Sequence, residues 1–309
     1  MADSSLPRVL TLFGPTAIGK TSIAIELADR LNGEIVSCDS RQVFKFLDIG
    51  TAKPTPAERD KARFHLVDIV PPDHFLNAYR FRLLASDAIR DILKREKTPI
   101  MTVGTGMYLK ALTDGIFEAP DADQELRSGL EKIADTNGLE ALHRRLADVD
   151  PEAASALSIN DRVRIIRALE LYNLSGKTRS ELQDERQLDP LPYSFVFAGL
   201  SLERKALYDR IDRRCEEMLE SGLIAEAKSL RENSVLSDSI AAKVVGYSEA
   251  YQYLDKLCSL EEMMKKFKQA TRNYAKRQLT WFRKHPGTDP FDIRDNGLID
   301  KILEQFWDA

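Results

Sequence analysis

The feature that most constrains this chain is the stretch LFGPTAIGKTS at residues 12–22, which fits the pattern G-x-x-x-x-G-K-[ST]. The apolar run RVLTLF at 8–13 leads into it, and residues 21–31 follow with apolar side chains at helical spacing. A strand, a glycine-rich loop and a helix in this order predict a phosphate-binding loop of the ATP-binding type. In such a loop, backbone N–H groups and the positive end of the helix face phosphate oxygens. The residues of the predicted loop are Gly14, Pro15, Thr16, Ala17, Ile18, Gly19, Lys20 and Thr21.

Two side chains of this loop carry further chemistry. Lys20 can neutralise phosphate charge, and the hydroxyl of Thr21 is a ligand that Mg²⁺ accepts, so Mg²⁺ is the predicted cofactor. The pattern does not say which phosphate is bound. It fits a nucleotide whose γ-phosphate is transferred, and it fits equally a phosphate group that departs from its substrate.

Further apolar runs predict the rest of a sheet. They lie at 34–38, 65–70, 99–103 and 194–200, and a long helical pattern spans 78–97. Strands that alternate with helices, each strand ending in a polar or glycine-rich loop, predict an α/β fold with a P-loop NTPase-like parallel sheet flanked by helices. Ligands bind beyond the carboxyl ends of the strands in such sheets, where the phosphate loop is expected.

The pattern changes in the middle of the chain. Residues 121–188 are charged and helical in pattern, without a convincing strand. We therefore predict an all-helical insertion domain at 116–192, within a P-loop catalytic core made by residues 1–115 and 193–309.

Composition narrows the class of protein. The chain has 45 basic and 49 acidic residues, a net charge of −4, which by itself argues against a nucleic-acid partner. Its three cysteines are scattered without a CxxC pair, which disfavours a disulfide framework or a zinc module and suits the reducing cytoplasm. No apolar run approaches the ~20 residues of a membrane helix, and the N-terminal residues have no signal-peptide pattern. A cytoplasmic protein without membrane association is expected.

Two more loops carry candidate functional residues. The stretch CDSRQVFKFLDIGTAKP at 38–54 places Asp39 at the end of a predicted strand. Its carboxylate could bind Mg²⁺ or accept a proton, or it could simply cap the turn that follows. The stretch VGTGMYLKAL at 103–112 is a second glycine-rich turn, with Thr105 between two glycines; alone it also fits an ordinary tight turn.

These motifs together resemble a known family. In this order and at these spacings, GPTAIGKT, DSRQVFKFLDIGTAKP, GTGMYLKAL, NDRVRIIRALE, LSGKT and YAKRQLTWFR are similar to the bacterial tRNA dimethylallyltransferases, also called tRNA isopentenyltransferases. The resemblance covers about residues 8–285, and DSRQV followed by DIGTAKP is highly specific to the family. One departure is Val103, where the family usually has the first of two glycines.

The resemblance implies a reaction and its residues. Family members transfer the allyl group of dimethylallyl diphosphate to N6 of the adenosine 3′ of a tRNA anticodon (adenosine-37), giving N6-isopentenyladenosine and diphosphate. The phosphate loop would then hold the leaving group, and a monomer would bind dimethylallyl diphosphate and a tRNA anticodon stem-loop. The implied catalytic residues are Asp39, Thr105 and Arg214, with Thr21 at the metal. The implied tRNA contacts are Asp39, Ser40, Arg41, Gln42, Thr105, Arg127, Val163, Arg164, Ile165, Ile166 and Arg167.

The residue types suit this chemistry. An exocyclic adenine amine is a poor nucleophile because its lone pair is delocalised into the ring. Departure of the diphosphate calls for loop amides, Lys20, Mg²⁺ and an arginine, and the amine must lose a proton, which suits Asp39. Arg210 and Arg214 lie i,i+4 on a predicted helix and share a face. By the resemblance Arg214 is the better candidate for the diphosphate; the alternative is an exposed arginine paired with a nearby carboxylate.

Three basic segments could bind nucleic acid although the net charge of the chain is negative. Residues 265–284 contain eight basic residues and no acidic one, and their aromatic residues recur every seven positions, which predicts a stripe facing the core. Residues 143–145 and 162–167 are also basic. Each segment alone fits solvated surface, and the three together predict a footprint for a phosphate backbone.

Three other functions fit parts of the sequence. A small-molecule kinase would use the loop to transfer the γ-phosphate of ATP. An isopentenyltransferase that acts on free AMP, ADP or ATP would need no helical insertion to grip its substrate. A non-catalytic RNA-binding protein with a relic phosphate loop would have no need to keep Lys20, Thr21 and Asp39 together.

Overall fold

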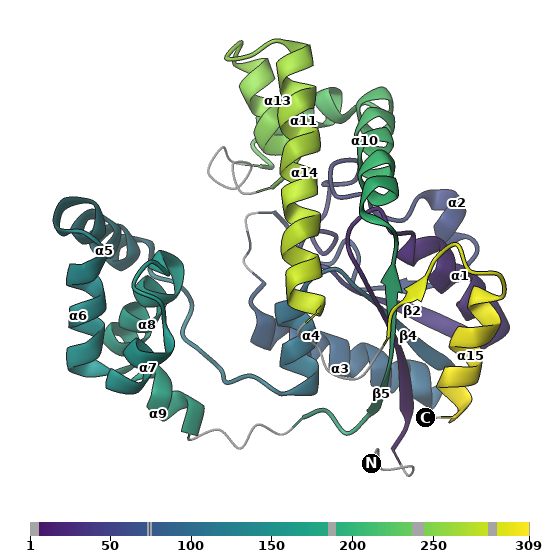
Figure 1. The fold of residues 1–309 in the computed structure, drawn as a ribbon, viewed down its shortest axis with the longest axis horizontal. Coiled ribbons are helices and arrows are strands. Elements are labelled where there is room, and N and C mark those ends of the chain that lie inside the picture. The colour runs from purple at the N-terminus through teal and green to yellow at the C-terminus, as the bar shows by residue number, and fades with distance from the viewer. Residues whose placement is uncertain are drawn as a thin grey trace. The chain divides into compact units, whose positions relative to one another are not determined.

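A parallel β-sheet forms the centre of the larger part of the chain (Figure 1). The computed structural model describes residues 6–72, 74, 76–184, 190–236, 244–283 and 289–308. Within these ranges six strands pair in the order β3-β2-β4-β1-β5-β6, and each neighbouring pair is parallel. The strands are β1 (Arg8–Phe13), β2 (Gly33–Cys38), β3 (Phe64–His65), β4 (Thr98–Val103), β5 (Ser194–Ser201) and β6 (Phe291–Asp292). The predicted α/β fold with a parallel sheet is confirmed.

Helices cover both faces of this sheet and extend past one end of it (Figure 1). One face carries α1 (Lys20–Arg30) and α15 (Leu298–Asp308), and the other carries α3 (Ala78–Lys94) and α4 (Gly106–Thr113). Beyond the carboxyl ends of the strands lie α10 (Arg204–Glu220), α11 (Leu223–Glu232), α13 (Tyr247–Leu254) and α14 (Leu260–Phe282). The short α2 (Pro56–Arg59) comes after β2 and before β3 in the chain.

Alternation along the strands divides the apolar residues between the two faces. Leu10 of β1 is in register with Ile100 of β4 and Val196 of β5, and all three pack into the core that contains α1. The next residue toward the N-terminus, Val9, points to the opposite core, where Phe81 of α3 is fully buried. A sheet buried on both faces explains the nearly continuous apolar runs of its strands.

Two strands differ from the prediction. The run at 65–70 forms only the two-residue β3, because Leu66 and Asp68 have φ angles of 63° and 60° and interrupt the extended backbone. Val70 instead makes an isolated parallel bridge to Phe44. The edge strand β6 was not predicted, since two residues are too few to show a pattern.

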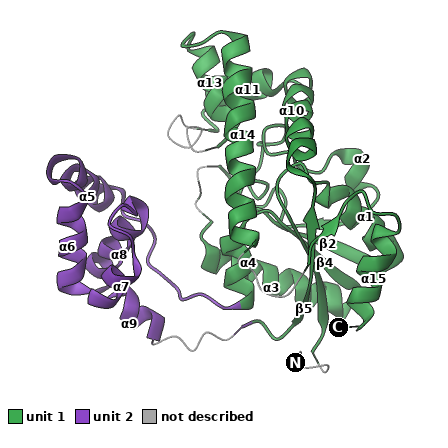
Figure 2. Cartoon of the chain, in the orientation of Figure 1, with its two compact units in different colours: residues 1–113, 191–309 green, residues 114–190 purple. Residues whose placement is uncertain are grey.

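The chain divides into two compact units (Figure 2). Unit 1 comprises Met1–Thr113 and Leu191–Ala309, and unit 2 comprises Asp114–Pro190, which overlaps almost completely with the predicted insertion. In the described residues of unit 2 the elements are all helices: α5 (Gln124–Asn137), α6 (Leu139–Val149), α7 (Pro151–Ala156), α8 (Arg162–Ser175) and α9 (Arg179–Asp184). They enclose a separate core that includes Leu130, Leu142, Leu146, Ile165 and Leu169.

None of the helices in the described ranges is both long enough and apolar enough to cross a membrane.

Candidate functional site

A cavity of about 1300 Å³ in unit 1 brings the predicted phosphate loop together with other candidate residues. Its walls come from the phosphate loop, the segment after β2, and helices α10 and α14. The lining side chains include Lys20, Thr21, Asp39, Arg41, Gln42, Arg210, Arg214, Tyr274 and Gln278. Residues from four separate parts of the chain therefore share one site.

The phosphate loop has the backbone that anion binding requires. It turns sharply between β1 and α1, with φ angles of 63° at Ala17 and 103° at Gly19. Glycine adopts this conformation without strain, whereas a non-glycine residue such as Ala17 costs about 1–3 kcal/mol there. No side chain of the described residues caps the start of α1, so the N–H groups of its first turn can meet an anion.

Two cations at the cavity are not neutralised by an ion pair. Lys20 Nζ donates to the carbonyl oxygens of Gly14, at 2.8 Å, and Pro15, at 3.0 Å. Arg214, which is partly buried, makes no hydrogen bond or ion pair with any residue in the described ranges. Burial lowers the pKa of Lys20 to about 8; Asp39 raises that pKa and Arg214 lowers it. Burial likewise lowers the pKa of Arg214. Two desolvated cations with little compensating charge form a site that an anion would stabilise.

The second arginine on the same face of α10 has a different task. Arg210 Nε donates to the carbonyl oxygen of Ala17 at 2.9 Å and so supports the strained turn of the phosphate loop. The predicted shared face of Arg210 and Arg214 is therefore present, and both line the cavity. The sequence did not show that Arg210 holds the loop and leaves Arg214 for a ligand.

Asp39 combines the two roles that the sequence left open. Its Oδ1 accepts the backbone N–H groups of Arg41, at 2.8 Å, and Gln42, at 3.4 Å, and so caps the turn that follows β2. Within the described residues no donor reaches Oδ2. One oxygen therefore fixes the carboxylate, and the other remains available at a site lined by cations.

Gly104 allows this carboxylate its position. A Cβ atom at Gly104 would collide with Asp39 Oδ2, so this place tolerates only glycine while Asp39 stays where it is. The preceding Val103 is the last residue of β4, and its side chain is fully buried in the core. The departure from the family pattern at Val103 thus falls within the strand, one residue before the turn at Gly104.

Thr105 supports the Asp39 loop from behind. Its hydroxyl accepts the N–H of Ser40 at 2.9 Å and donates to Ser40 Oγ at 3.1 Å. Of the described residues, Asp39, Arg41 and Gln42 line the cavity, and Ser40 and Thr105 do not. The contacts of Thr105 therefore position the loop that carries Asp39.

Gln42 is engaged at both ends of its amide. Its Oε1 accepts from Ser37 Oγ at 2.9 Å, and its Nε2 donates to the carbonyl oxygens of Ala52, at 3.0 Å, and Thr51, at 3.4 Å. The side chain thus binds the DSRQ loop to the DIGTAKP turn.

Lys53 and Cys38 are two further residues of the segment 38–54. Lys53 lines the cavity, but its Nζ is bound between the carboxylates of Asp48 and Asp68. Burial, and next Asp39, raise the pKa of the Cys38 thiol well above its usual value, so it is not a nucleophile near neutral pH.

Helix α14 contributes a predicted aromatic stripe and one glutamine that the sequence did not reveal. Its aromatic stripe faces inward as predicted: Phe267 is buried in the core, Tyr274 lines the cavity, and Trp281 packs on Gly106. Between them Gln278, 7% exposed, accepts from Thr16 N and donates to Gly104 O, each at 2.8 Å. No local pattern distinguishes this glutamine from its polar neighbours.

In unit 2, two arginines that were predicted to contact tRNA form ion pairs with a buried carboxylate. Glu170 is fully buried and pairs with Arg127 at 2.8 Å and with Arg167 at 2.6 Å. Burial alone would raise the pKa of Glu170, but hydrogen bonds from Arg167 and Arg127 hold it below its usual value. Both arginines therefore have a structural task in unit 2.

The other residues of α8 that were predicted to contact tRNA fall into a buried pair and an exposed pair. Ile165 and Ile166 are 0% and 4% exposed and belong to the core of unit 2, so their side chains are not on a surface. Val163, in contrast, is 78% exposed, and the side chain of Arg164 is 68% exposed. The segment 163–167 thus offers Val163 and Arg164 to a partner.

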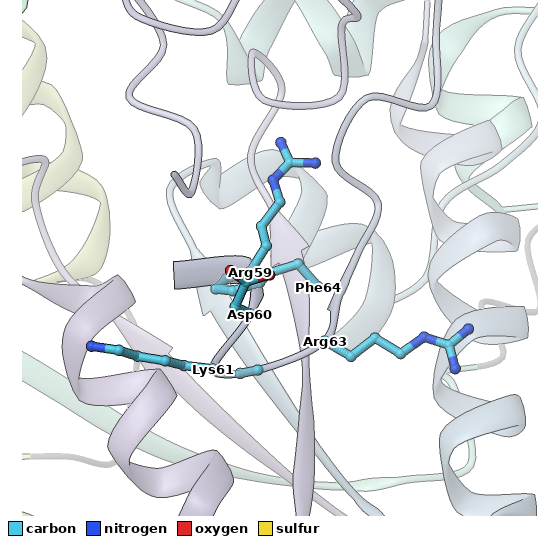
Figure 3. Close-up of a pocket in the computed structure, with 6 residues that line it drawn as sticks. Arg59, Asp60, Lys61, Arg63 and Phe64 are labelled. Carbon is cyan, nitrogen blue, oxygen red and sulfur yellow. The ribbon is translucent and has the colours of Figure 1, made fainter. Parts of the chain in front are cut away.

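A smaller cavity of about 460 Å³ lies along residues 59–64 (Figure 3). Figure 3 shows Arg59, Lys61 and Arg63 pointing in different directions, so their charges do not converge on one ligand. Arg59 is also paired with Asp68 at 2.7 Å. This cavity is lined by residues 59–64 alone and does not include the phosphate loop or Asp39.

The fold and the larger cavity define a P-loop-like protein in which Lys20 and Arg214 share a cavity with the carboxylate of Asp39. The IPP transferase family matches residues 42–285, and the isopentenyl transferase family matches residues 7–71. The chain belongs to the IPP transferase family.

Known proteins resemble this chain over most of its length. A tRNA dimethylallyltransferase from Halalkalibacterium halodurans is 42% identical over 299 residues, 96% of this chain and 95% of that protein. The crystal structure of a full-length tRNA isopentenylpyrophosphate transferase from Bacillus halodurans is similar with a TM-score of 0.69 and 40% identity, covering 97% of this chain and 94% of that one. A eukaryotic dimethylallyltransferase acting on tRNA gives a TM-score of 0.75 at 30% identity, over 89% of this chain and 70% of that one.

Proposed function

We propose that this chain transfers the dimethylallyl group of dimethylallyl diphosphate to tRNA, at N6 of the adenosine 3′ of the anticodon (adenosine-37), and releases diphosphate. The relative named as a tRNA dimethylallyltransferase and the neighbour solved acting on tRNA support this reaction. The observation that carries it in this chain is the pair of cations, Lys20 and Arg214, beside Asp39 at one cavity. Cations suit an anionic leaving group, and a carboxylate suits the proton that leaves the amine.

In this proposal the diphosphate binds the phosphate loop and is not transferred. Its oxygens meet the N–H groups at the start of α1, Lys20 and Arg214. Negative charge grows on the diphosphate as the bond between its oxygen and the allylic carbon breaks. Donors that are already in place stabilise that charge most where water is excluded.

Asp39 accepts the proton as N6 bonds to the allylic carbon. The oxygen that we assign is Oδ2, because Oδ1 is occupied by the N–H groups of Arg41 and Gln42. An adenine within the stacked anticodon loop must be turned out of the stack to reach the cavity. Thr105 and Gln42 hold the loops around Asp39 and so fix the carboxylate toward the amine.

Mg²⁺ fits this site as an ion bound mainly by the substrate. The described residues hold no group of three His, Cys, Asp or Glu side chains able to bind a metal. Mg²⁺ commonly uses one or two protein groups together with substrate phosphates and water, and the hydroxyl of Thr21 lines the cavity beside Lys20. When bound there, the ion would neutralise charge on the diphosphate.

The lowered pKa of Lys20 predicts a pH dependence of diphosphate binding. Because the pKa is about 8, Lys20 in the free protein is charged below that pH and loses its proton above it. We expect kcat/KM for dimethylallyl diphosphate to be level below pH 8 and to fall above it, by up to about tenfold per pH unit. Steady-state kinetics from pH 6.5 to 9.5 measure this, with Lys20→Arg as the control, since arginine keeps its charge throughout. A wild-type profile that stays level above pH 9 would contradict the proposed contact between Lys20 and the diphosphate.

Unit 2 is proposed to bind the anticodon stem-loop, with Arg164 on its exposed surface. Arg164→Ala should weaken tRNA binding and reduce the slope of log affinity against log salt by about 0.7–0.9, because one phosphate contact is lost. The KM for dimethylallyl diphosphate should not change. Arg164 is preferred to Arg167, whose loss would leave the buried Glu170 short of a partner.

The matched control for this measurement is Arg90→Ala. Arg90 pairs with Asp87 at 3.1 Å across one helical turn of α3, as Arg164 pairs with Asp161 at 3.2 Å. Filter-binding titrations over a salt series should separate the two variants. The proposed contact is excluded if Arg164→Ala keeps the wild-type affinity and the wild-type salt slope.

The competing functions are separated by one set of reactions. The protein is incubated with Mg²⁺ and labelled dimethylallyl diphosphate, and the acceptor is tRNA, free AMP, or the same tRNA with guanosine at position 37. We expect label only in the unaltered tRNA. Label in AMP would favour a free-nucleotide isopentenyltransferase, and phosphoryl transfer from added ATP would favour a kinase.

We keep the monomer as the working form for these experiments. A tRNA substrate supports the predicted cytoplasmic location.

A further inference from the structure

Gln278 of α14 connects the phosphate loop to the turn that follows β4. Its Oε1 accepts the N–H of Thr16 in the phosphate loop at 2.8 Å, and its Nε2 donates to the carbonyl oxygen of Gly104 at 2.8 Å. The side chain is 7% exposed, so both bonds are shielded from water. A buried amide that uses both of its polar ends sets a fixed distance between the two backbones that it binds.

The bond to Gly104 continues to Asp39. The N–H groups of Gly104 and Thr105 donate to the carbonyl oxygen of Cys38, at 3.0 and 3.1 Å, directly before Asp39. Gly104 also lies against Asp39 Oδ2, where it leaves no room for a side chain. A continuous set of contacts therefore runs from the phosphate loop through Gln278 and Gly104 to the carboxylate.

The packing of α14 does not depend on this amide. Trp281 lies on Gly106, and Tyr274 Oη donates to the carbonyl oxygen of Gly104 at 3.4 Å. Farther along the helix, Arg272 pairs with Asp212 of α10, and Phe267 is buried in the core. Loss of the two hydrogen bonds of Gln278 should therefore leave the helix in place.

We propose that Gln278 is a positioning residue that sets the separation between the phosphate loop and Asp39, and so aligns the allyl donor with the acceptor amine. This inference rests on the proposed function, because it assigns the two aligned substrates to those two loops. A misplacement of about 1 Å between reacting groups can cost on the order of 10²-fold in rate. Gln278 would thus act on the rate through Asp39, without being the group that takes the proton.

The first test is Gln278→Met, which keeps the length of the side chain and removes both hydrogen bonds. We expect kcat for tRNA prenylation to fall by about 10- to 100-fold, with the two KM values near those of the wild type. Gln269→Met is the control, because Gln269 is an exposed glutamine on the same helix and lies outside the cavity lining. An unchanged kcat in Gln278→Met would overturn the inference.

A double-mutant cycle with Asp39→Asn distinguishes positioning from a general structural role. If Gln278 acts through Asp39, Gln278→Met should cost much less kcat in the Asp39→Asn background than in the wild type. Equal losses in the two backgrounds would contradict the proposed route. A wild-type protein that transfers no allyl group to tRNA would refute the proposed function itself, which is a separate outcome.

Gln278→Glu provides a second variant should Gln278→Met fail to fold. A protonated carboxyl group can accept from Thr16 N and donate to Gly104 O as the amide does, whereas an ionised one cannot donate. The kcat of Gln278→Glu relative to the wild type should therefore rise as the pH falls through the pKa of the introduced carboxyl group. A ratio that does not change with pH would count against the two-bond role.

Discussion

Asp39→Asn should lower the turnover number for prenyl transfer by about 10²–10⁴-fold, the usual contribution of a positioned general base. The amide oxygen of asparagine can still accept the N–H groups of Arg41 and Gln42, so the turn after β2 should keep its shape. The amide cannot take a proton from the adenine amine. Asp39 is not assigned to the diphosphate, so binding of dimethylallyl diphosphate should stay close to that of the wild type at a pH well below 8. Nearer pH 8 it should weaken, because Asp39 raises the pKa of Lys20 and its charge is lost in Asp39→Asn.

Single-turnover rates with both substrates saturating measure this effect directly. Asp87→Asn, an exposed carboxylate on α3, controls for the change of formal charge. Asp39→Ala should lower the rate of transfer at least as much, with additional loosening of the turn because alanine lacks the capping oxygen. If Asp39→Asn turns over at nearly the wild-type rate, Asp39 is a capping residue and the proton goes elsewhere.

Arg214→Ala should lower kcat/KM for dimethylallyl diphosphate by roughly 10- to 150-fold, since a hydrogen bond to a charged group is lost. This corresponds to a loss of about 1.5–3 kcal/mol of transition-state stabilisation. Lys20→Ala should cause a loss of similar size or larger. The affinity for tRNA in the absence of the diphosphate should not change. Arg204→Ala, at the exposed start of the same helix, is the control.

The two cations also affect each other, which gives this prediction an independent readout. Arg214 lowers the pKa of Lys20, so its removal should move the fall of kcat/KM above pH 8 to a higher pH. If Arg214→Ala has unaltered kinetics with dimethylallyl diphosphate and an unshifted pH profile, Arg214 does not bind the diphosphate.

The parts of the site that the sequence predicted are those that local signals define. The phosphate loop follows from eight consecutive residues between a strand and a helix, and the parallel sheet follows from strands that alternate with helices. Asp39 was found because it ends a strand, and a strand end in a parallel sheet is where ligands bind. These inferences need no knowledge of distant contacts.

The parts that the sequence did not predict depend on distant contacts. The bond between Thr16 and Gln278 joins residues 262 positions apart, and the bond between Arg210 and Ala17 joins residues 193 positions apart. The predicted strand at 65–70 was too long for a local reason, since the left-handed backbone of Leu66 carries no clear sequence signal.

Burial also changed the interpretation of the tRNA surface. The motif NDRVRIIRALE predicted contacts at every residue of 163–167 by resemblance, although a helix exposes only part of its circumference. Ile165 and Ile166 face the core of unit 2, and Arg167 binds the buried carboxylate of Glu170. The proposed surface is therefore narrower than the motif, and Arg164 is its best test.

The central claim is that the phosphate loop holds a leaving group. Dimethylallyl diphosphate labelled with ¹⁴C in the allyl group and ³²P in the diphosphate is incubated with the protein, Mg²⁺ and an anticodon stem-loop. We predict that ¹⁴C enters the RNA at adenosine-37 and that an equal number of moles of ³²P appears as free diphosphate. Recovery of ³²P in the RNA, or of ¹⁴C only in unreacted substrate, would contradict the claim.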